Sequence, residues 1–175
     1  TPTSLSNADF ERMLSLVEGA FYGEHTGEFT VEAGRPDTMT PEKALSMKKH
    51  RVSRVSVNPQ TMQQRTLERI GRAHTPEDIV RMFRLLRETG DFSINMDVIL
   101  GLPGEMRSDV ADTMAKVLAL APDDVTLHSL ALKRGSKLKM HLEEYELPND
   151  SEVQAMFRTA MKQVQDEGFL PYYLY

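Results

Sequence analysis

The feature of this 175-residue sequence that most constrains its fold is a regular alternation between helical and strand-like hydrophobic patterns. Apolar residues recur every three or four positions in some segments, and every second position in the segments between them. The clearest strand pattern is 92–100, where apolar residues alternate with Ser93, Asn95 and Asp97. This order predicts a parallel sheet made of βαβ units. Periodicity alone does not decide whether that sheet is an open one or part of a barrel.

Helix-start signals and turn residues give the expected bounds of the individual elements. We expect helices at 7–22, 40–50, 75–90, 108–121 and 151–167, and strands at 28–33, 54–58, 92–100 and 124–132. Thr-Pro-Glu begins two helices, at Thr40 and Thr75, because a threonine hydroxyl can cap a helix while proline and an acidic residue suit its first turn. Asn7 is the expected N-cap of the first helix. GLPGE at 101–105 is expected to be a tight strand-to-helix turn, and PYYLY at 171–175 is a candidate for a last short strand.

The composition excludes several classes of function. The sequence has no cysteine, which rules out disulfides, zinc–thiolate sites, a thiolate nucleophile and an iron–sulfur cluster bound by the chain's own thiols. The histidines lack metal-ligand spacing, so we expect no metal site. A net charge of −5 with mixed signs offers little attraction to nucleic acid or anionic lipid. No apolar run approaches the roughly 20 residues that span a bilayer. We expect a single cytoplasmic domain, 1–175, without nucleic-acid partner or membrane span.

Polar residues gather where the predicted strands end. Glu32 ends the first strand, Asn58 and Gln60 follow the second, and the third carries Asn95 and Asp97. In a parallel β/α arrangement the carboxyl ends of all strands lie at one edge, which is where ligands bind. A strand buried on both faces would instead be an almost continuous run of Val, Ile and Leu. The pattern has two interpretations, a small-molecule site or a polar layer whose members satisfy one another.

Seven segments occur along the chain in a characteristic order. They are TPTSL at 1–5, EFTVEAGRPDT at 28–38, NPQTM at 58–62, IGRAHT at 70–75, INMDVILGLPGE at 94–105, HSLALKR at 128–134 and PYYLY at 171–175. Together they resemble the radical S-adenosylmethionine (SAM) enzymes of the oxygen-independent coproporphyrinogen III oxidase family, most closely its anaerobic coproporphyrinogen dehydrogenase branch. The resemblance implies an α/β fold: a partial TIM-like β/α barrel of the radical SAM type, with parallel strands and with the amino-terminal strands missing.

The resemblance also implies which residues bind the cofactor SAM. The corresponding positions are Thr1, Glu32, Gln60, Arg72, Asp97 and Ala131. Thr1 matches a threonine that follows three glycines in a loop touching the methionyl end of SAM, and Ala131 matches a backbone contact. Carboxylates suit the amino group and ribose of SAM, whereas an arginine suits its carboxylate. Glu32, Gln60 and Asp97 are also strand-end residues, so two independent arguments select them.

The absence of cysteine departs from this family, whose [4Fe-4S] cluster is bound by a C-x3-C-x2-C loop. We therefore expect the cluster to be ligated outside these residues, and the chain to be a fragment that begins inside the glycine-rich loop at Thr1. A natural relative without the cluster is the alternative. The chain alone is expected to be inactive as an enzyme, and the sheet edge left by missing strands predicts self-association.

The activity implied by the resemblance is the radical oxidative decarboxylation of coproporphyrinogen III to protoporphyrinogen IX in haem biosynthesis. The substrate would be a porphyrinogen, and the sequence does not identify the electron donor. A haem-binding chaperone is the alternative, because relatives of this family carry haem. GRPDT at 34–38 and KRGSKL at 133–138 favour the dehydrogenase branch, whereas a haem carrier would need an exposed ligand such as His25 or His141. An unrelated barrel enzyme with Glu32 and Asp97 as acid and base does not explain the ordered segments.

Overall fold

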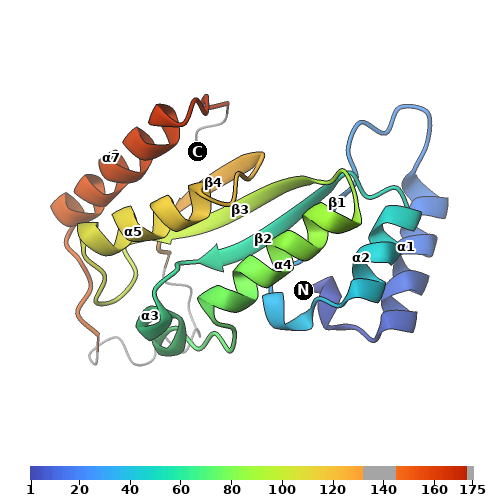
Figure 1. Ribbon diagram of the computed structural model, residues 1–175, viewed down its shortest axis with the longest axis horizontal. Helices are drawn as coiled ribbons and strands as arrows, with labels where there is room; N and C mark the ends of the chain where they lie inside the picture. The colour runs from blue at the N-terminus through green and yellow to red at the C-terminus, as the bar shows by residue number, and fades with distance from the viewer. Residues whose placement is uncertain (132–144, 173–175) are drawn as a thin grey trace. The chain divides into compact units, whose positions relative to one another are not determined.

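The computed structural model describes residues 1–131 and 145–172, and within them four strands form one sheet. The strand order is β1-β2-β3-β4, and the strands are parallel (Figure 1). Their bounds are Thr30–Glu32 for β1, Arg54–Gln60 for β2, Ser93–Leu100 for β3 and Asp124–Ser129 for β4. Sequential order in a parallel sheet requires a crossover between neighbouring strands, and helices supply it here. The predicted βαβ organisation is therefore confirmed.

Contacts divide the chain into two compact units, each with its own helices. The first unit comprises Thr1–Pro59, His74–Met96 and Pro122–Asp124. The second comprises Gln60–Ala73 and Asp97–Ala121, together with the described residues of Val125–Tyr175. The single domain expected over residues 1–175 stays a prediction. Among the helices of the described residues, none combines the length and the apolar character that crossing a membrane demands.

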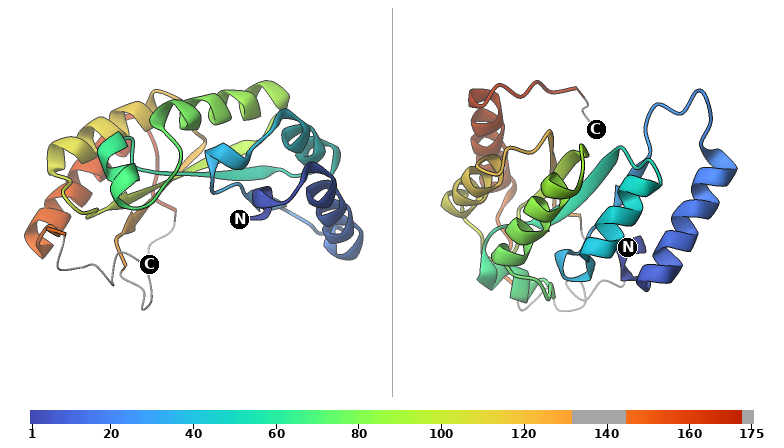
Figure 2. Two further views of the ribbon diagram at one scale, coloured as in Figure 1. Left: turned by 90° about the horizontal axis from the view of Figure 1, so that it is seen from below. Right: turned by 45° about the vertical axis from the view of Figure 1, so that its right-hand side comes forward.

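Helices α1, α2 and α4 of the first unit bury one apolar stripe each. Their bounds are Asn7–Phe21, Pro41–Lys49 and Pro76–Thr89, and two short 3-10 helices, η1 and η2, cover Pro2–Ser4 and Pro36–Thr38. Helix α2 packs against both α1 and α4 (Figure 2). Phe10, Met47 and Leu86 are fully buried representatives of the three stripes. Burying a side chain of this size contributes about 2 kcal/mol, so the predicted periodicity does stabilise these helices.

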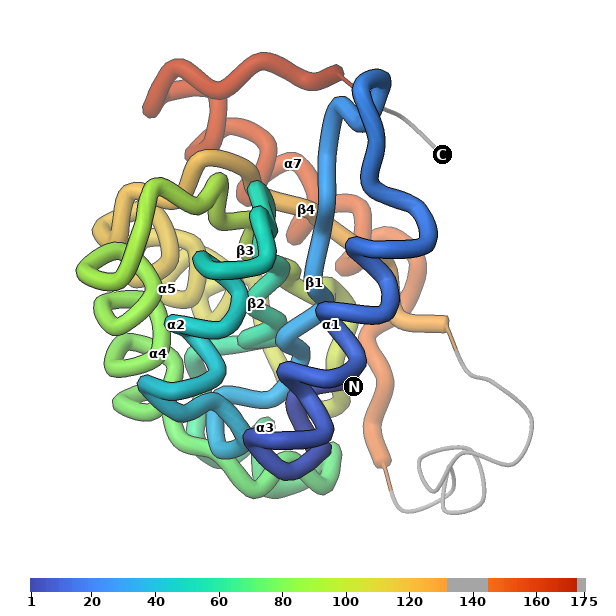
Figure 3. The backbone as a smooth tube through the Cα atoms, turned by 90° about the vertical axis from the view of Figure 1, so that its right-hand side faces the viewer, coloured from blue at the N-terminus to red at the C-terminus, as the bar shows by residue number. Residues whose placement is uncertain are grey.

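The helix starts of the first unit follow the predicted chemistry with one correction. Thr40 accepts the Lys43 N–H at 3.3 Å, and Thr75 forms a reciprocal capping box with Asp78. The expected N-cap at Asn7 is wrong, because the Ser6 hydroxyl accepts the Asp9 N–H at 3.1 Å and Asn7 is the first residue inside the helix. After α1 the chain runs through a loop without helix or strand to β1 (Figure 3).

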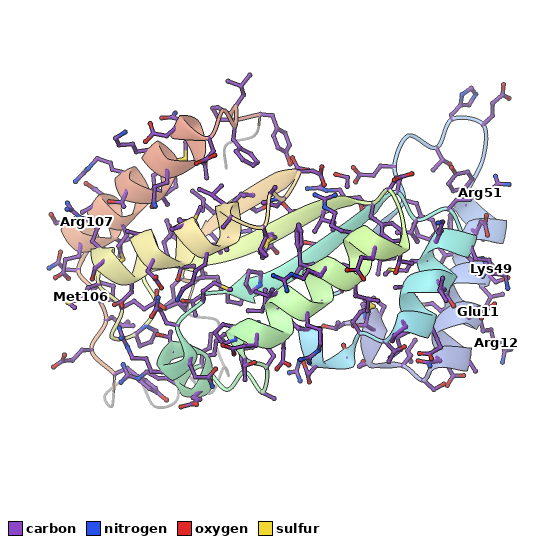
Figure 4. The ribbon with its side chains drawn as sticks, in the orientation of Figure 1. Glu11, Arg12, Lys49, Arg51, Met106 and Arg107 are labelled. Atoms are coloured by element: carbon purple, nitrogen blue, oxygen red, sulfur yellow. The ribbon has the colours of Figure 1, made fainter. Side chains whose placement is uncertain are left out.

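One ion pair joins the exposed sides of two helices in the first unit. Glu11 of α1 pairs with Lys49 of α2, and Figure 4 shows the two labelled side chains close together. The Lys49 side chain is 66% exposed, so solvent screens this pair and it contributes little to stability.

The second unit holds α3, α5 and α7, which cover Gln64–Arg69, Arg107–Leu118 and Asp150–Asp166. Helices α5 and α7 pack together through a shared apolar core that includes Met114 and Met156. Helix α3 is not among the helices expected from the sequence, because six residues are too few to develop a helical period. The predicted turn at 101–105 is present, with positive φ values of 83° at Gly101 and 72° at Gly104.

Two further expectations concern the carboxyl-terminal part of the chain. Pro171 and Tyr172 form no strand, so the final strand expected over PYYLY is not found in its described part, and 173–175 lie outside the described residues. The basic end of HSLALKR, the KRGSKL segment and His141 also lie outside the described residues. Strand β1 stands at one edge of the sheet and is only three residues long. Self-association through that edge stays a prediction.

Candidate functional site

One face of the sheet in the first unit carries a row of polar side chains. Glu32 of β1 lies directly opposite Ser56 of β2 in the parallel register. The Asn95 side chain of β3 donates from Nδ2 to the Ser56 hydroxyl at 3.0 Å, and both of these residues are buried. Residues opposite each other in a sheet share a face, so Glu32, Ser56 and Asn95 form a row across three strands. The alternate residues of β2 and β3 are apolar and buried.

Asn58 lies on the same face of β2, two residues beyond Ser56. Its Oδ1 atom is buried and accepts no hydrogen bond from any residue between 1 and 131 or 145 and 172. A buried acceptor without a partner costs about 1 to 3 kcal/mol, which makes Asn58 a place where a donor from a ligand would be stabilising. Ser56 and Asn95 therefore fit the interpretation of a polar layer whose members bond to one another. Asn58 Oδ1 does not fit it.

The segment after β1 is arranged around Thr1. Gly34 has a φ of 37°, and a Cβ atom placed on it would lie 2.9 Å from the Thr1 hydroxyl oxygen. Glycine at this position therefore permits both the backbone turn and the close approach of Thr1. Since Gly34 is two residues after Glu32, the structure brings Thr1 close to the segment that follows one of the predicted cofactor residues.

A buried lysine fixes this arrangement. The Lys43 ammonium of α2 donates to the backbone oxygens of Thr3, at 2.7 Å, and Thr38, at 2.9 Å. The Thr3 hydroxyl in turn donates to the Ala33 oxygen at 3.1 Å and bonds to the Thr38 hydroxyl at 2.7 Å. We call Thr3, Ala33, Thr38 and Lys43 the lysine anchor. It joins η1, the end of β1 and η2, because a buried ammonium is stable only when its donors are satisfied.

The other four predicted cofactor residues belong to the second unit. Gln60 is the last residue of β2, is buried, and adopts a φ of 66°, which is rare for a residue with a side chain. Asp97 lies within β3 and Arg72 follows α3, and both are half-buried, whereas Ala131 follows β4 and is exposed. Thr1 and Glu32 are thus in one unit, and Gln60, Asp97, Arg72 and Ala131 are in the other. The assignment of all six to one cofactor site stays a prediction.

The second unit contains a buried carboxyl group that sequence reasoning missed. The Thr61 hydroxyl donates to Glu105 Oε1 at 2.6 Å and lies 3.2 Å from the Thr113 hydroxyl. Thr66 also bonds to the Glu105 carboxyl through its side chain. We call Thr61, Thr66, Glu105 and Thr113 the Glu105 cluster. No local pattern could have indicated it, because its members are separated by up to 52 positions in the sequence.

Burial is the main electrostatic influence on Glu105. It raises the pKa of this carboxyl above the ordinary value of 4.5, whereas the hydrogen bonds from Thr61 and Thr66 lower it. The negative charge of Asp109 acts with burial, and the positive charge of Arg65 acts against it. Burial has the larger effect, so the neutral acid is favoured relative to a glutamate in water.

The residues present do not fit an iron–sulfur cluster. The chain has no cysteine, and in the part of the chain that the structure describes no group of three or more histidine, aspartate or glutamate side chains is arranged so that it could hold a metal ion. Iron–sulfur clusters are held mainly by cysteine thiolates. Any cluster that works with this chain must therefore be ligated by other residues.

Comparison with known proteins agrees with the observed fold. A family model described as "Radical SAM superfamily" matches residues 1–117. The oxygen-independent coproporphyrinogen-III oxidase-like protein HemZ of Bacillus subtilis is 36% identical over 176 residues, which cover 100% of this chain and 35% of HemZ. The heme chaperone HemW of the same organism is 28% identical over 175 residues, covering 98% of this chain and 46% of HemW. The chain thus spans about a third to a half of the length of these relatives.

Solved structures give the same fold at lower sequence identity. Coproporphyrinogen III oxidase (HemN) from Escherichia coli superposes with a TM-score of 0.83 at 21% identity, covering 97% of this chain and 39% of that one. Elp3 of the archaeon Methanocaldococcus infernus reaches 0.77 at 16% identity, covering 91% and 42%. The expected partial TIM-like barrel of the radical SAM type is therefore confirmed, and it answers the choice between barrel and open sheet that periodicity left open.

Proposed function

This chain belongs to the radical SAM superfamily, and we propose that it forms part of the SAM-binding surface of a longer protein related to oxygen-independent coproporphyrinogen III oxidases. The observation that carries the proposal is the polar face of β1, β2 and β3, where the buried Asn58 Oδ1 lacks a hydrogen-bond donor among the residues described. The proposed site residues are Thr1, Glu32, Gln60, Arg72, Asp97 and Ala131, and Asn58 is added to them.

The donor and acceptor groups of SAM match the chemistry of these residues. SAM carries an amino group, a carboxylate, ribose hydroxyls and an adenine. The Glu32 and Asp97 carboxylates suit the amino group and the hydroxyls, and the Arg72 guanidinium suits the carboxylate. Asn58 Oδ1 and Gln60 can accept from a hydroxyl or an exocyclic amine. In radical SAM proteins the bound cofactor, together with a reduced cluster, supplies the radical chemistry, so this chain's task is to bind and orient.

The lysine anchor and the Glu105 cluster support a binding and orienting role for this chain. Lys43 and Glu105 are both buried and hydrogen-bonded, and both groups adjoin proposed cofactor residues rather than containing them. Binding sites gain precision when the backbone that carries them is held by a supporting layer of hydrogen bonds. The [4Fe-4S] cluster is part of the longer protein in this proposal and is ligated outside the chain.

The substrate in this proposal is a porphyrinogen, and the reaction is oxidative decarboxylation rather than haem carriage. The relative named as oxidase-like is 36% identical to this chain, whereas the relative named as a heme chaperone is 28% identical. His25, the described candidate for a haem ligand, is exposed in the loop between α1 and β1, as a haem carrier would require, so haem binding is the competing outcome in the test of the reaction.

SAM binding is tested in the intact protein that carries this chain, with its cluster reconstituted. We expect Glu32→Gln and Asp97→Asn each to weaken SAM binding by about tenfold or more, since a charge-assisted hydrogen bond contributes about 1.5 to 3 kcal/mol. Glu24→Gln, at an exposed glutamate of the loop between α1 and β1, is the matched control and should leave the affinity unchanged. Unchanged affinity in both site variants would refute the proposed SAM site.

The reaction is tested in the same protein by supplying coproporphyrinogen III, SAM and a reductant, and separately by titrating haem. Formation of protoporphyrinogen IX supports the oxidase proposal. Stoichiometric haem binding without any decarboxylation would overturn the oxidase proposal in favour of a haem carrier. The SAM-site proposal would still be decided by the affinity measurements.

A further inference from the structure

The backbone at Gln60 is held in a conformation that needs external support. A φ of 66° places this residue in the left-handed region, which costs a residue with a side chain about 1 to 2 kcal/mol. Such a conformation persists only where the surrounding structure imposes it. The residues that follow Gln60 directly, Thr61 to Gln63, are the ones that the Glu105 cluster binds.

In the hydrogen bonds of the Glu105 cluster, each hydroxyl donates to the next group, and the last acceptor is the Glu105 carboxyl. The Met62 N–H donates to the Thr113 hydroxyl and the Gln63 N–H to the Thr61 hydroxyl, both at 3.2 Å. The single proton of Thr61 goes to Glu105 Oε1, so the contact between the two hydroxyls requires that Thr113 donates to Thr61. Each hydroxyl therefore donates once, and the chain ends at Glu105 Oε1 as its fixed acceptor.

Other contacts bind the same connection at the surface. The Gln63 side-chain amide donates to Asp112 Oδ2 at 2.7 Å, and the Arg65 guanidinium pairs with Asp109 at 2.7 Å. Arg69 donates to the Pro103 oxygen at 3.1 Å. Asp112 and the Arg65 side chain are about half exposed, so solvent competes with these bonds. The Glu105 cluster differs because its bonds are buried and water does not compete with them.

A neutral acid suits this role. The protonated carboxyl keeps an oxygen that accepts from Thr61, and it buries no charge. The charged groups near it are Asp109 and Arg65 of the flanking segments, which act in opposite directions. A glutamine side chain would reproduce the acceptor, the volume and the neutrality of the protonated acid.

We propose that Glu105 is a positioning residue that fixes the connection after β2 and thereby presents Gln60 to SAM. The inference rests on the SAM-binding function proposed above and assigns to Glu105 no contact with the cofactor. It makes cofactor affinity depend on a hydrogen-bond acceptor at position 105, and not on a charge there.

The test compares Glu105→Gln with Glu105→Ala in the cluster-reconstituted intact protein. We expect Glu105→Ala to weaken SAM binding at least tenfold, and Glu105→Gln to remain within about twofold of the wild type. Amide hydrogen exchange at Met62 and Gln63 should become at least tenfold faster in the alanine variant and stay slow in the glutamine variant. Glu146→Ala, at an exposed glutamate of the same unit, is the control and should change neither measurement.

Thr61→Val keeps the volume at position 61 and removes the hydroxyl donor. It is the variant to measure if Glu105→Ala does not fold. It should reproduce both the loss of affinity and the faster exchange. Normal affinity with Glu105→Ala or Thr61→Val, or a glutamine variant as defective as the alanine variant, would overturn the proposal. The exchange measurement needs no cofactor, so a wild-type protein that fails to bind SAM but shows the expected exchange pattern would refute the proposed function alone.

Discussion

The lysine anchor and the Glu105 cluster solve the same problem with opposite chemistry. Each uses one buried ionisable side chain and two or more threonines to fix the backbone beside a proposed cofactor residue. Lys43 is a donor that satisfies backbone oxygens, whereas Glu105 is an acceptor that satisfies side-chain hydroxyls. A neutral amide can replace an acceptor acid, but no neutral side chain of similar length carries the donors of an ammonium. The lysine anchor should therefore tolerate substitution of Lys43 less well than the Glu105 cluster tolerates substitution of Glu105.

The largest expected effect is on the lysine anchor. Lys43→Met keeps most of the aliphatic length but leaves the Thr3 and Thr38 oxygens without their donor, and we expect a loss of about 3 kcal/mol in the free energy of unfolding. Urea denaturation measures it. Lys49→Met, in the same helix but at an exposed ion pair, should cost less than about 1 kcal/mol. Equal costs for the two variants would contradict the role of the anchor.

Substitutions of Glu105 should have a smaller and graded effect. Glu105→Ala leaves the Thr61 hydroxyl without its acceptor and opens a cavity, so we expect a loss of about 2 kcal/mol. Glu105→Gln should stay within about 1 kcal/mol of the wild type. Urea denaturation of the two variants checks this order. A glutamine variant as unstable as the alanine variant would mean that this carboxyl acts through its charge, and the contrast with Lys43 would fail.

The pH dependence of stability should distinguish Glu105 from an ordinary surface carboxylate. Because burial raises the pKa of Glu105, its contribution is complete below the unfolded value of 4.5 and is lost as the pH rises through the folded value. The stability of the wild type relative to Glu105→Gln should therefore fall as the pH rises above 4.5.

Asp112 provides the control of opposite sign. The hydrogen bond from Lys116 lowers the pKa of Asp112 below 3.8, so its contribution is present above that value and lost as the pH falls. The stability of the wild type relative to Asp112→Asn should rise with pH over the acidic range. Identical slopes for the two substitutions, measured by urea denaturation across a pH series, would contradict the burial of Glu105.

The smallest expected effect on stability concerns Asn58, which belongs to neither the lysine anchor nor the Glu105 cluster. Asn58→Leu removes a buried acceptor without a partner among the described residues and keeps a similar volume, so we expect the cofactor-free protein to gain up to about 1 kcal/mol. The same variant should bind SAM more weakly, as measured by calorimetry in the cluster-reconstituted protein. A loss of stability with unchanged SAM affinity would show instead that Asn58 is structural.

The sequence allowed the fold to be predicted wherever the deciding signal was local. Hydrophobic periods and the Thr-Pro-Glu starts at Thr40 and Thr75 located the main helices and strands. Ser6 was missed as an N-cap because Asn7 beside it has the same capping propensity, and the choice depends on where the backbone enters the helix. Helix α3 was missed because its six residues make fewer than two turns, too few to develop a period.

The candidate site was predictable only in part. The polar strand residues Glu32 and Asp97 were apparent because they interrupt strands that should otherwise be apolar. Lys43 and Glu105 gave no such signal, since a lysine in a helix and a glutamate after a turn are ordinary surface residues in any sequence. Their roles depend on contacts with distant residues, such as Thr3 and Thr61, 40 and 44 positions away, which the fold creates and no local pattern encodes.

The burial of Lys43 also has a practical consequence for chemical labelling. Only 6% of this residue is exposed and its amine is occupied by two backbone oxygens, so amine-reactive reagents should modify lysines such as Lys49 and Lys162 long before they reach it. Acylation of Lys43, detected by mass spectrometry of its peptide, would then mark the molecules whose first unit has opened. A single lysine thus acts as a built-in footprinting probe for the segment that carries Thr1 and Glu32.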